Sequence, residues 1–226
     1  MPTVQIPASQ VNSITYQDGS WTGTRNNPSG TIQSTGVRDA WIKQVAGRGG
    51  TIYDIARIFT IFDTSAYAGS ITAVNLAFSS QGSPNTSMDV IAVESVAYGG
   101  SPGGFLTIND YSALNQAQTY TSQTSIPTVG TSIVMSGNVN FVTLANTGTA
   151  NIAIINGSYD QQDIDPGGSS WTEIYLDINS SLLSSTFLEI TYTAAGYGYN
   201  VNGVAPADIS RIYGVATADI AEVNGV

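Results

Sequence analysis

Short apolar runs separated by turn-forming residues follow one another along most of the chain and predict β-strands. In residues 57–63 apolar side chains occupy both alternating sets of positions, which is typical of a central strand that is buried on two faces. In residues 71–78 the side chains of Val74, Leu76 and Phe78 share one face. Further strands are expected at residues 88–93, 138–144, 151–155, 171–178 and 187–193.

Glycine-, asparagine- and proline-rich segments such as 99–104 and 166–168 separate these runs and mark turns. No long stretch follows a helical period. Asp110 is placed to cap one short helix over residues 111–118, because its carboxylate can accept the free N–H groups of a first turn. Many short strands with polar turns predict an all-β fold, an antiparallel β-sandwich of jelly-roll type.

The C-terminal residues 201–226 repeat with a period of eleven, and each copy begins with Val or Ile and continues as x-Gly-Val. A unit this small cannot bury its own apolar side chains, so they must pack elsewhere. We therefore divide the chain into a sandwich body, residues 1–195, and a short C-terminal repeat tail for docking or assembly, residues 196–226. The predicted assembly residues are Val201, Gly203, Val204, Ile209, Ile212, Gly214, Val215, Ile220, Val223 and Val226.

The tail has two possible binding modes. It can dock on a neighbouring subunit or another protein, or it can fold back and add strands to the edge of its own sandwich. Identical units suit a repetitive or symmetric surface, so the repeat favours docking.

The amino-acid composition excludes several kinds of catalytic, metal and binding site. The chain has no His and no Cys, which excludes imidazole-based triads, disulfides and zinc–sulfur sites. Its formal charge of −10 argues against a nucleic-acid partner, because the phosphate backbone would repel it. No apolar run is long enough for a membrane span. We expect neither nucleic-acid binding nor membrane insertion.

Only 10% of the residues are charged, so Ser, Thr, Asn, Gln and Gly must supply the polar surface. This surface is common among extracellular β-proteins and virion proteins. The N-terminal segment has neither the basic nor the apolar region of a secretory signal. The two features together indicate a virion protein that assembles in the host cytoplasm and works in the extracellular particle.

Residues 159–168 place three carboxylates ahead of a glycine-rich turn. Asp160, Asp163 and Asp165 are candidate calcium ligands, because Ca²⁺ takes six to eight oxygens from carboxylates and loop carbonyls. The spacing is not that of an EF-hand, and a solvated acidic loop is the alternative. No other cofactor is expected.

Aromatic side chains suggest a contact with sugars, whose C–H faces pack on rings. Trp21, Trp41 and Trp171 are candidates, but core packing or a subunit contact explains each of them better than sugar stacking does. Tyr197 and Tyr199 flank Gly198 where body and tail join, and they are the predicted glycan-binding residues.

Paired carboxylates can also hydrolyse glycosides, and Asp163, Asp165 and Glu173 are available for such a reaction. Sequence spacing does not establish the separation in space that hydrolysis needs. The acidic residues are scattered, as surface acids are in most β-proteins, so we expect no enzyme and no catalytic residues.

The order of motifs resembles a β-sandwich family of tailed-bacteriophage virion proteins and related carbohydrate-binding-like modules. The resemblance rests on Asp18–Trp21, Arg25, Gly30 and residues 58–65, 69–76, 109–111, 141–148 (taken as a strand and a turn) and 187–193, and it extends over roughly residues 15–193. In the second strand the Ala stands one residue out of step with the family pattern. The tail resembles the short Asn-Gly-Val-Ala repeats at the C-termini of phage structural proteins.

The resemblance implies a non-enzymatic virion structural protein, either a head decoration, a fibre or a tail-associated component. Its expected partners are other virion proteins, further copies of itself, with a trimer as the first guess, and host-surface polysaccharide. The alternative is a carbohydrate-binding module of a secreted or surface protein.

Overall fold

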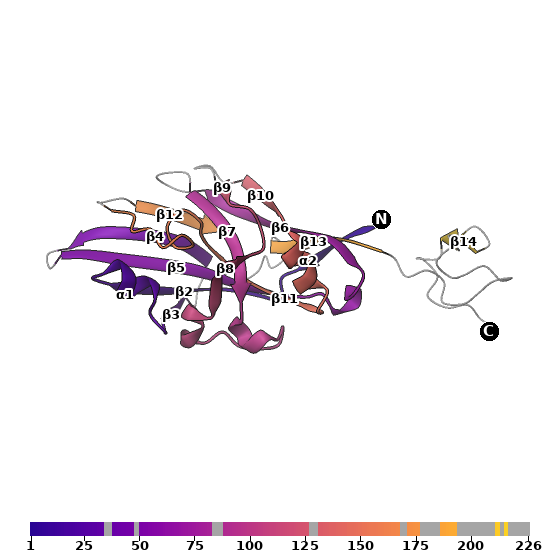
Figure 1. Ribbon diagram of the computed structural model, residues 1–226, viewed down its shortest axis with the longest axis horizontal. Helices are drawn as coiled ribbons and strands as arrows, with labels where there is room; N and C mark the ends of the chain where they lie inside the picture. Colours follow the sequence, from indigo (N-terminus) through magenta and orange to yellow (C-terminus); the bar gives the residue numbers. More distant parts are fainter. Residues whose placement is uncertain are drawn as a thin grey trace.

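The structure, a computed structural model of the 226-residue chain, is an antiparallel β-sandwich, which confirms the predicted fold class (Figure 1). Strands far apart in the sequence lie side by side, as β1 (Thr3–Pro7) does with β13 (Thr186–Tyr192). The structure describes residues 1–33, 38–47, 50–82, 88–126, 131–167, 171–176, 186–193, 211–212 and 215–216.

Two groups of strands form the body. The first consists of β1, β13, β6 (Ile71–Gly82) and β10 (Thr131–Ser136). The second consists of β3 (Thr31–Gln33), β2 (Gln10–Asp18), β5 (Gly50–Asp63), β4 (Arg38–Gly47), β11 (Thr149–Asn156), β7 (Met88–Ser95), β8 (Leu114–Thr119) and β9 (Thr124–Ile126). Strand β12 (Trp171–Leu176) pairs with both β6 and β4 and so joins the two groups.

Strand β5 is the centre of the second group and contains the predicted two-faced strand. One of its edges pairs with β2, and the other pairs first with β4 and then with β11. Its residues from Tyr53 to Phe62 are all buried, which confirms the expectation from the apolar run.

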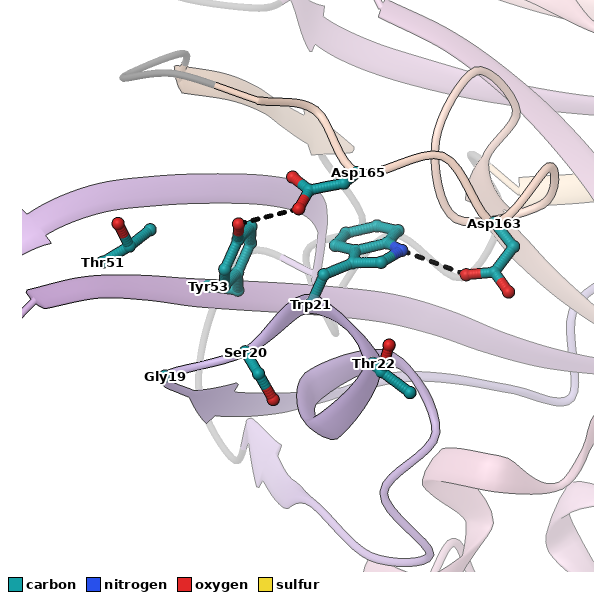
Figure 2. A pocket seen from close by; sticks show the side chains of 8 residues that line it. All are labelled: Gly19, Ser20, Trp21, Thr22, Thr51, Tyr53, Asp163 and Asp165. Atoms are coloured by element: carbon teal, nitrogen blue, oxygen red, sulfur yellow. Dashed lines mark hydrogen bonds between the residues drawn. The ribbon is translucent and has the colours of Figure 1, made fainter.

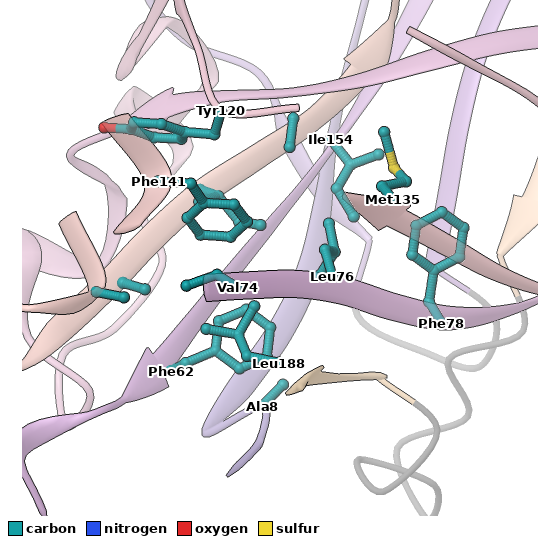
Figure 3. Packing of buried hydrophobic residues seen from close by; sticks show 14 of the residues in the cluster. Ala8, Phe62, Val74, Leu76, Phe78, Tyr120, Met135, Phe141, Ile154 and Leu188 are labelled. Atoms are coloured by element: carbon teal, nitrogen blue, oxygen red, sulfur yellow. The ribbon is translucent and has the colours of Figure 1, made fainter. Parts of the chain in front are cut away.

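The two faces of β5 enter two separate apolar cores. Ile58 and Phe62 belong to the first core, between the two strand groups, together with Leu76, Leu188 and their neighbours. Figure 3 shows Phe62 among these side chains. Phe59 and the side chains that alternate with it enter a second core on the opposite face. The second core contains Ile14, Trp21, Ile42, Tyr53, Ile55, Phe59, Ile61, Ile91, Val93, Ala97, Tyr98, Tyr111, Ala153 and Ile155.

The segment expected as a strand at residues 138–144 is instead helix α2 (Val139–Ala145), so this expectation is wrong. Asn138 caps the helix, because its side-chain oxygen accepts the N–H groups of Asn140 and Phe141. Phe141 and Ala145 lie one turn apart and are both buried in the first core. The buried apolar residues of this segment therefore follow the spacing of a helix and not the alternation that a strand requires.

The expectation of a helix at residues 111–118 is also wrong. A 3-10 turn, η3 (Ile108–Ser112), ends there, and β8 follows on the edge of β7. Asp110 takes part in a capping box with Thr107, whose backbone N–H it accepts at 2.7 Å, so it lies inside the turn rather than ahead of it. The remaining short elements are α1 (Trp21–Arg25), η1 (Ser65–Tyr67) and η2 (Ala97–Gly100).

In the tail, β14 (Arg211–Ile212) and β15 (Val215–Ala216) pair with each other and form a two-stranded sheet separate from the body (Figure 1). The division into body and tail stays a prediction. Across the parts of the chain that the structure describes, no helix is long and apolar enough to cross a membrane.

The first core predicts different effects for two chemically identical substitutions. Val74 is 2% exposed and packs between the strand groups, whereas Val134 on β10 is 57% exposed. Val74→Ala should lower the free energy of unfolding by about 2 kcal/mol, because it leaves a cavity. Val134→Ala should change it by less than about 0.5 kcal/mol, and urea unfolding of both variants measures the difference. Equal losses would contradict the assignment of the core.

Candidate functional site

The segment that follows β11, residues 157–167, is held to the body by a buried ion pair. Asp160 Oδ1 and Oδ2 accept two hydrogen bonds of 2.7 Å from Nη2 and Nε of Arg57 on β5. Both side chains are almost fully buried. This bidentate geometry is the most directional that arginine forms with a carboxylate. It determines where the rest of the segment lies.

The guanidinium of Arg57 has further partners on its remaining N–H groups. It donates to the backbone oxygens of Tyr111 and Arg25, both at 2.9 Å, and its Cζ lies 4.3 Å from the centre of the Tyr111 ring. Burial alone would lower the pKa of Arg57, but the charge of Asp160, the charge interaction with Tyr111 and the hydrogen bonds to Asp160 hold it above its ordinary value. Arg57 is therefore charged at every physiological pH.

A second arginine lies beside this pair. Arg25, the last residue of α1, donates from Nε to the backbone oxygen of Asp160 at 2.8 Å and lies 3.5 Å from Oδ1 of both Asp160 and Asp163. Gln116 on β8 donates to Asp160 Oδ1 at 2.8 Å and accepts from Arg25. These contacts join β5, α1, β8 and the 157–167 segment into one polar network.

An open pocket of about 720 Å³ lies next to this network, where the start of α1 meets the first half of β5 (Figure 2). Its walls combine two aromatic rings, two carboxylates and three aliphatic hydroxyl groups. The lining residues are Gly19, Ser20, Trp21, Thr22, Thr51, Tyr53, Asp163 and Asp165.

Each pocket carboxylate accepts a hydrogen bond from one pocket ring. Trp21 Nε1 donates to Asp163 Oδ1 at 3.0 Å, and the Tyr53 hydroxyl donates to Asp165 Oδ2 at 2.9 Å (Figure 2). The backbone N–H of Gly167 donates to the other oxygen of Asp165 at 2.9 Å. The two rings meet edge to face with centroids 6.0 Å apart. Both carboxylates are thus held by neutral donors, and the charged guanidinium of Arg25 lies close to Asp163 as well.

Asp163 has an unusual backbone conformation, with φ of 57°. A non-glycine residue adopts this left-handed region only occasionally, and Asp and Asn do so most readily. The conformation turns the chain so that the carboxylate reaches Trp21 while its side chain stays 56% exposed. An exposed carboxylate in a fixed position can accept hydrogen bonds from a ligand.

The structure separates the three predicted calcium ligands. Asp160 is occupied by Arg57, whereas Asp163 and Asp165 line the pocket. Among the residues that the structure describes, no three acidic side chains form a group that could hold a metal ion. The prediction that Asp160, Asp163 and Asp165 act together as calcium ligands is therefore corrected, because a buried arginine already neutralises one of them.

Among the aromatic candidates whose side chains the structure describes, Trp21 lines the pocket. Trp41 and Trp171 belong to the neighbouring strands β4 and β12, where Trp41 pairs with Glu173. The predicted glycan-binding residues Tyr197 and Tyr199 lie outside the described part of the chain.

Among the predicted assembly residues, Ile212 and Val215 are paired directly across β14 and β15. Their assembly role stays a prediction. The other eight lie outside the described residues: Val201, Gly203, Val204, Ile209, Gly214, Ile220, Val223 and Val226.

Sequence reasoning missed Tyr53, Arg57 and Gln116. A signal for Arg57 was present, because an arginine at the start of a run that is buried on both faces needs a buried carboxylate partner. No sequence signal identifies Asp160 as that partner, since the two residues are 103 positions apart.

No protein-family model matches the sequence, and no curated protein is significantly similar to it.

The buried ion pair predicts a large stability difference between two neighbouring aspartates. Asp160→Asn leaves Arg57 charged, buried and without its counter-ion, so the free energy of unfolding should fall by about 3–5 kcal/mol. Asp163→Asn changes an exposed side chain and keeps an acceptor for Trp21, so its effect should stay below about 1 kcal/mol. Urea unfolding measures both, and similar small losses would show that the ion pair does not hold the segment.

Proposed function

We propose that this protein is a non-enzymatic structural protein of a bacteriophage virion, assembled in the host cytoplasm. In this proposal the sandwich body forms part of the particle surface, and the repeat tail binds other virion proteins or further copies of the chain. The observation that carries the proposal is the separation of the tail hairpin, β14 with β15, from the strands of the body.

The repeated apolar positions of the tail support docking. A two-stranded hairpin is marginally stable on its own in water, so it needs a surface to pack on. The same apolar positions recur in each eleven-residue copy, as Val204 and Val215 do. Equivalent positions at a fixed period match a binding surface that is itself repeated, as in a symmetric assembly.

The composition of the body supports a structural role. A protein with 10% charged residues and neither His nor Cys has few of the side chains on which enzymes most often rely. The buried charges of the site are used to hold the 157–167 segment to β5.

A carbohydrate-binding function is the second candidate, within the virion or as a module of a secreted or surface protein. The pocket of Trp21, Tyr53, Asp163 and Asp165 favours it, since hydroxyl and carboxylate groups beside aromatic rings suit a polyhydroxylated ligand.

Removal of the tail tests the structural proposal. A chain that ends at residue 200 should keep the unfolding midpoint of the body but be lost from purified particles, as measured by mass spectrometry. Absence of the full-length chain from particles would contradict the virion proposal, and normal incorporation of the shortened chain would contradict docking through the tail.

A point variant refines this test. Replacing both Val204 and Val215 by Ser removes apolar contact at equivalent repeat positions and should reduce incorporation at least ~10-fold. Thr217→Ser in the same tail is the matched control and should leave incorporation unchanged.

A further inference from the structure

The aromatic rings of the pocket present only small areas to a ligand. Trp21 and Tyr53 are 7% and 8% exposed, so most of each ring is covered by the second core. A sugar ring that stacks flat on an aromatic face needs far more exposed ring area. Recognition in this pocket must therefore come mainly from its polar groups.

Those polar groups are mostly acceptors. The Trp21 and Tyr53 donors are already directed at Asp163 and Asp165. Both oxygens of Asp165 and Oδ1 of Asp163 already accept one hydrogen bond each, but every carboxylate oxygen has a second lone pair. These lone pairs can only accept, since an ionised carboxylate has no proton to give. Such a pocket fits a ligand that supplies several donors from one point, and a protonated amine supplies three.

The net charge of the site also favours a protonated amine as the ligand. The polar network and the pocket contain two guanidinium groups, Arg25 and Arg57, and three carboxylates, Asp160, Asp163 and Asp165. Within this set of described residues, one negative charge is left in excess. A uronate or phosphate group would meet repulsion there, whereas one ammonium group would neutralise the site.

The site is fixed before any ligand arrives. The Arg57–Asp160 pair anchors the segment, and the ring donors orient both carboxylates. A pre-organised site loses little conformational entropy on binding.

We propose that the Trp21–Tyr53–Asp163–Asp165 pocket binds an amino sugar, with Asp163 and Asp165 accepting hydrogen bonds from its protonated amine. The hydroxyls of Ser20, Thr22 and Thr51 line the same pocket and suit the ring hydroxyls of the sugar. This inference rests on the carbohydrate-binding function given above as the second candidate. It is independent of docking through the tail.

Calorimetric titration of the full-length chain tests the ligand class. The probes are short oligomers of glucosamine, N-acetylglucosamine, glucose and glucuronate, together with a lysine peptide of matched charge. The glucosamine oligomer should bind at least about tenfold more tightly than its N-acetylated counterpart, because acetylation removes the charge. Its affinity should fall as salt rises.

Three outcomes overturn the proposal. If the N-acetylated or the glucose oligomer binds as tightly as the glucosamine oligomer, the site does not recognise the amine. Equal binding of the lysine peptide removes the role of the sugar. No measurable binding of the glucosamine oligomer removes the site altogether.

A matched pair of variants locates the site. Asp163→Asn keeps an acceptor for Trp21 and a residue that tolerates positive φ, but it removes the charge, so the dissociation constant should rise about tenfold. Glu189→Gln removes one carboxylate from β13, at the other end of the body from α1, and should leave binding unchanged (Figure 1). Unchanged binding by Asp163→Asn overturns the proposal.

Particle incorporation of Asp163→Asn separates this proposal from the structural one. Normal incorporation is expected whether or not the variant binds sugar. Loss of incorporation together with intact sugar binding would place Asp163 in an assembly contact and overturn its role in the pocket.

Discussion

The buried Arg57–Asp160 ion pair is the interaction on which the candidate site depends. It places a positive charge beside the second core and a negative charge on the segment after β11. Moving either group away would leave the other charge buried without its counter-ion. The pocket is a consequence of that constraint. Because the segment is held at Asp160, Asp163 and Asp165 three and five residues later fall beside Trp21 and Tyr53.

The two-sided burial of β5 explains why the site lies where it does. One face of the strand closes the core between the two strand groups. The other face is covered by α1, by the turns η2 and η3, and by the segment after β11. These covering elements are short and irregular, and they carry the polar side chains. A rigid strand thus supports a site that is assembled from loops.

The structural and binding proposals use different parts of the molecule. The tail supplies repeated apolar positions, and its hairpin is separate from the sheet of the body. The pocket lies on the covered face of β5. In these proposals the chain attaches through the tail and contacts a ligand through the body.

Alternating apolar residues determined the strands at 71–78 and 187–193, and the doubly apolar run at 57–63 determined the central position of β5. The same reasoning failed at residues 138–144, because Asn138 and the spacing of Phe141 and Ala145 favour a helix once there is a core for it to pack on. The sequence contained Trp21, Asp163 and Asp165 as separate candidates. Only the tertiary structure decided that they share a pocket, because a contact between residues 142 positions apart depends on how the whole chain packs rather than on local pattern.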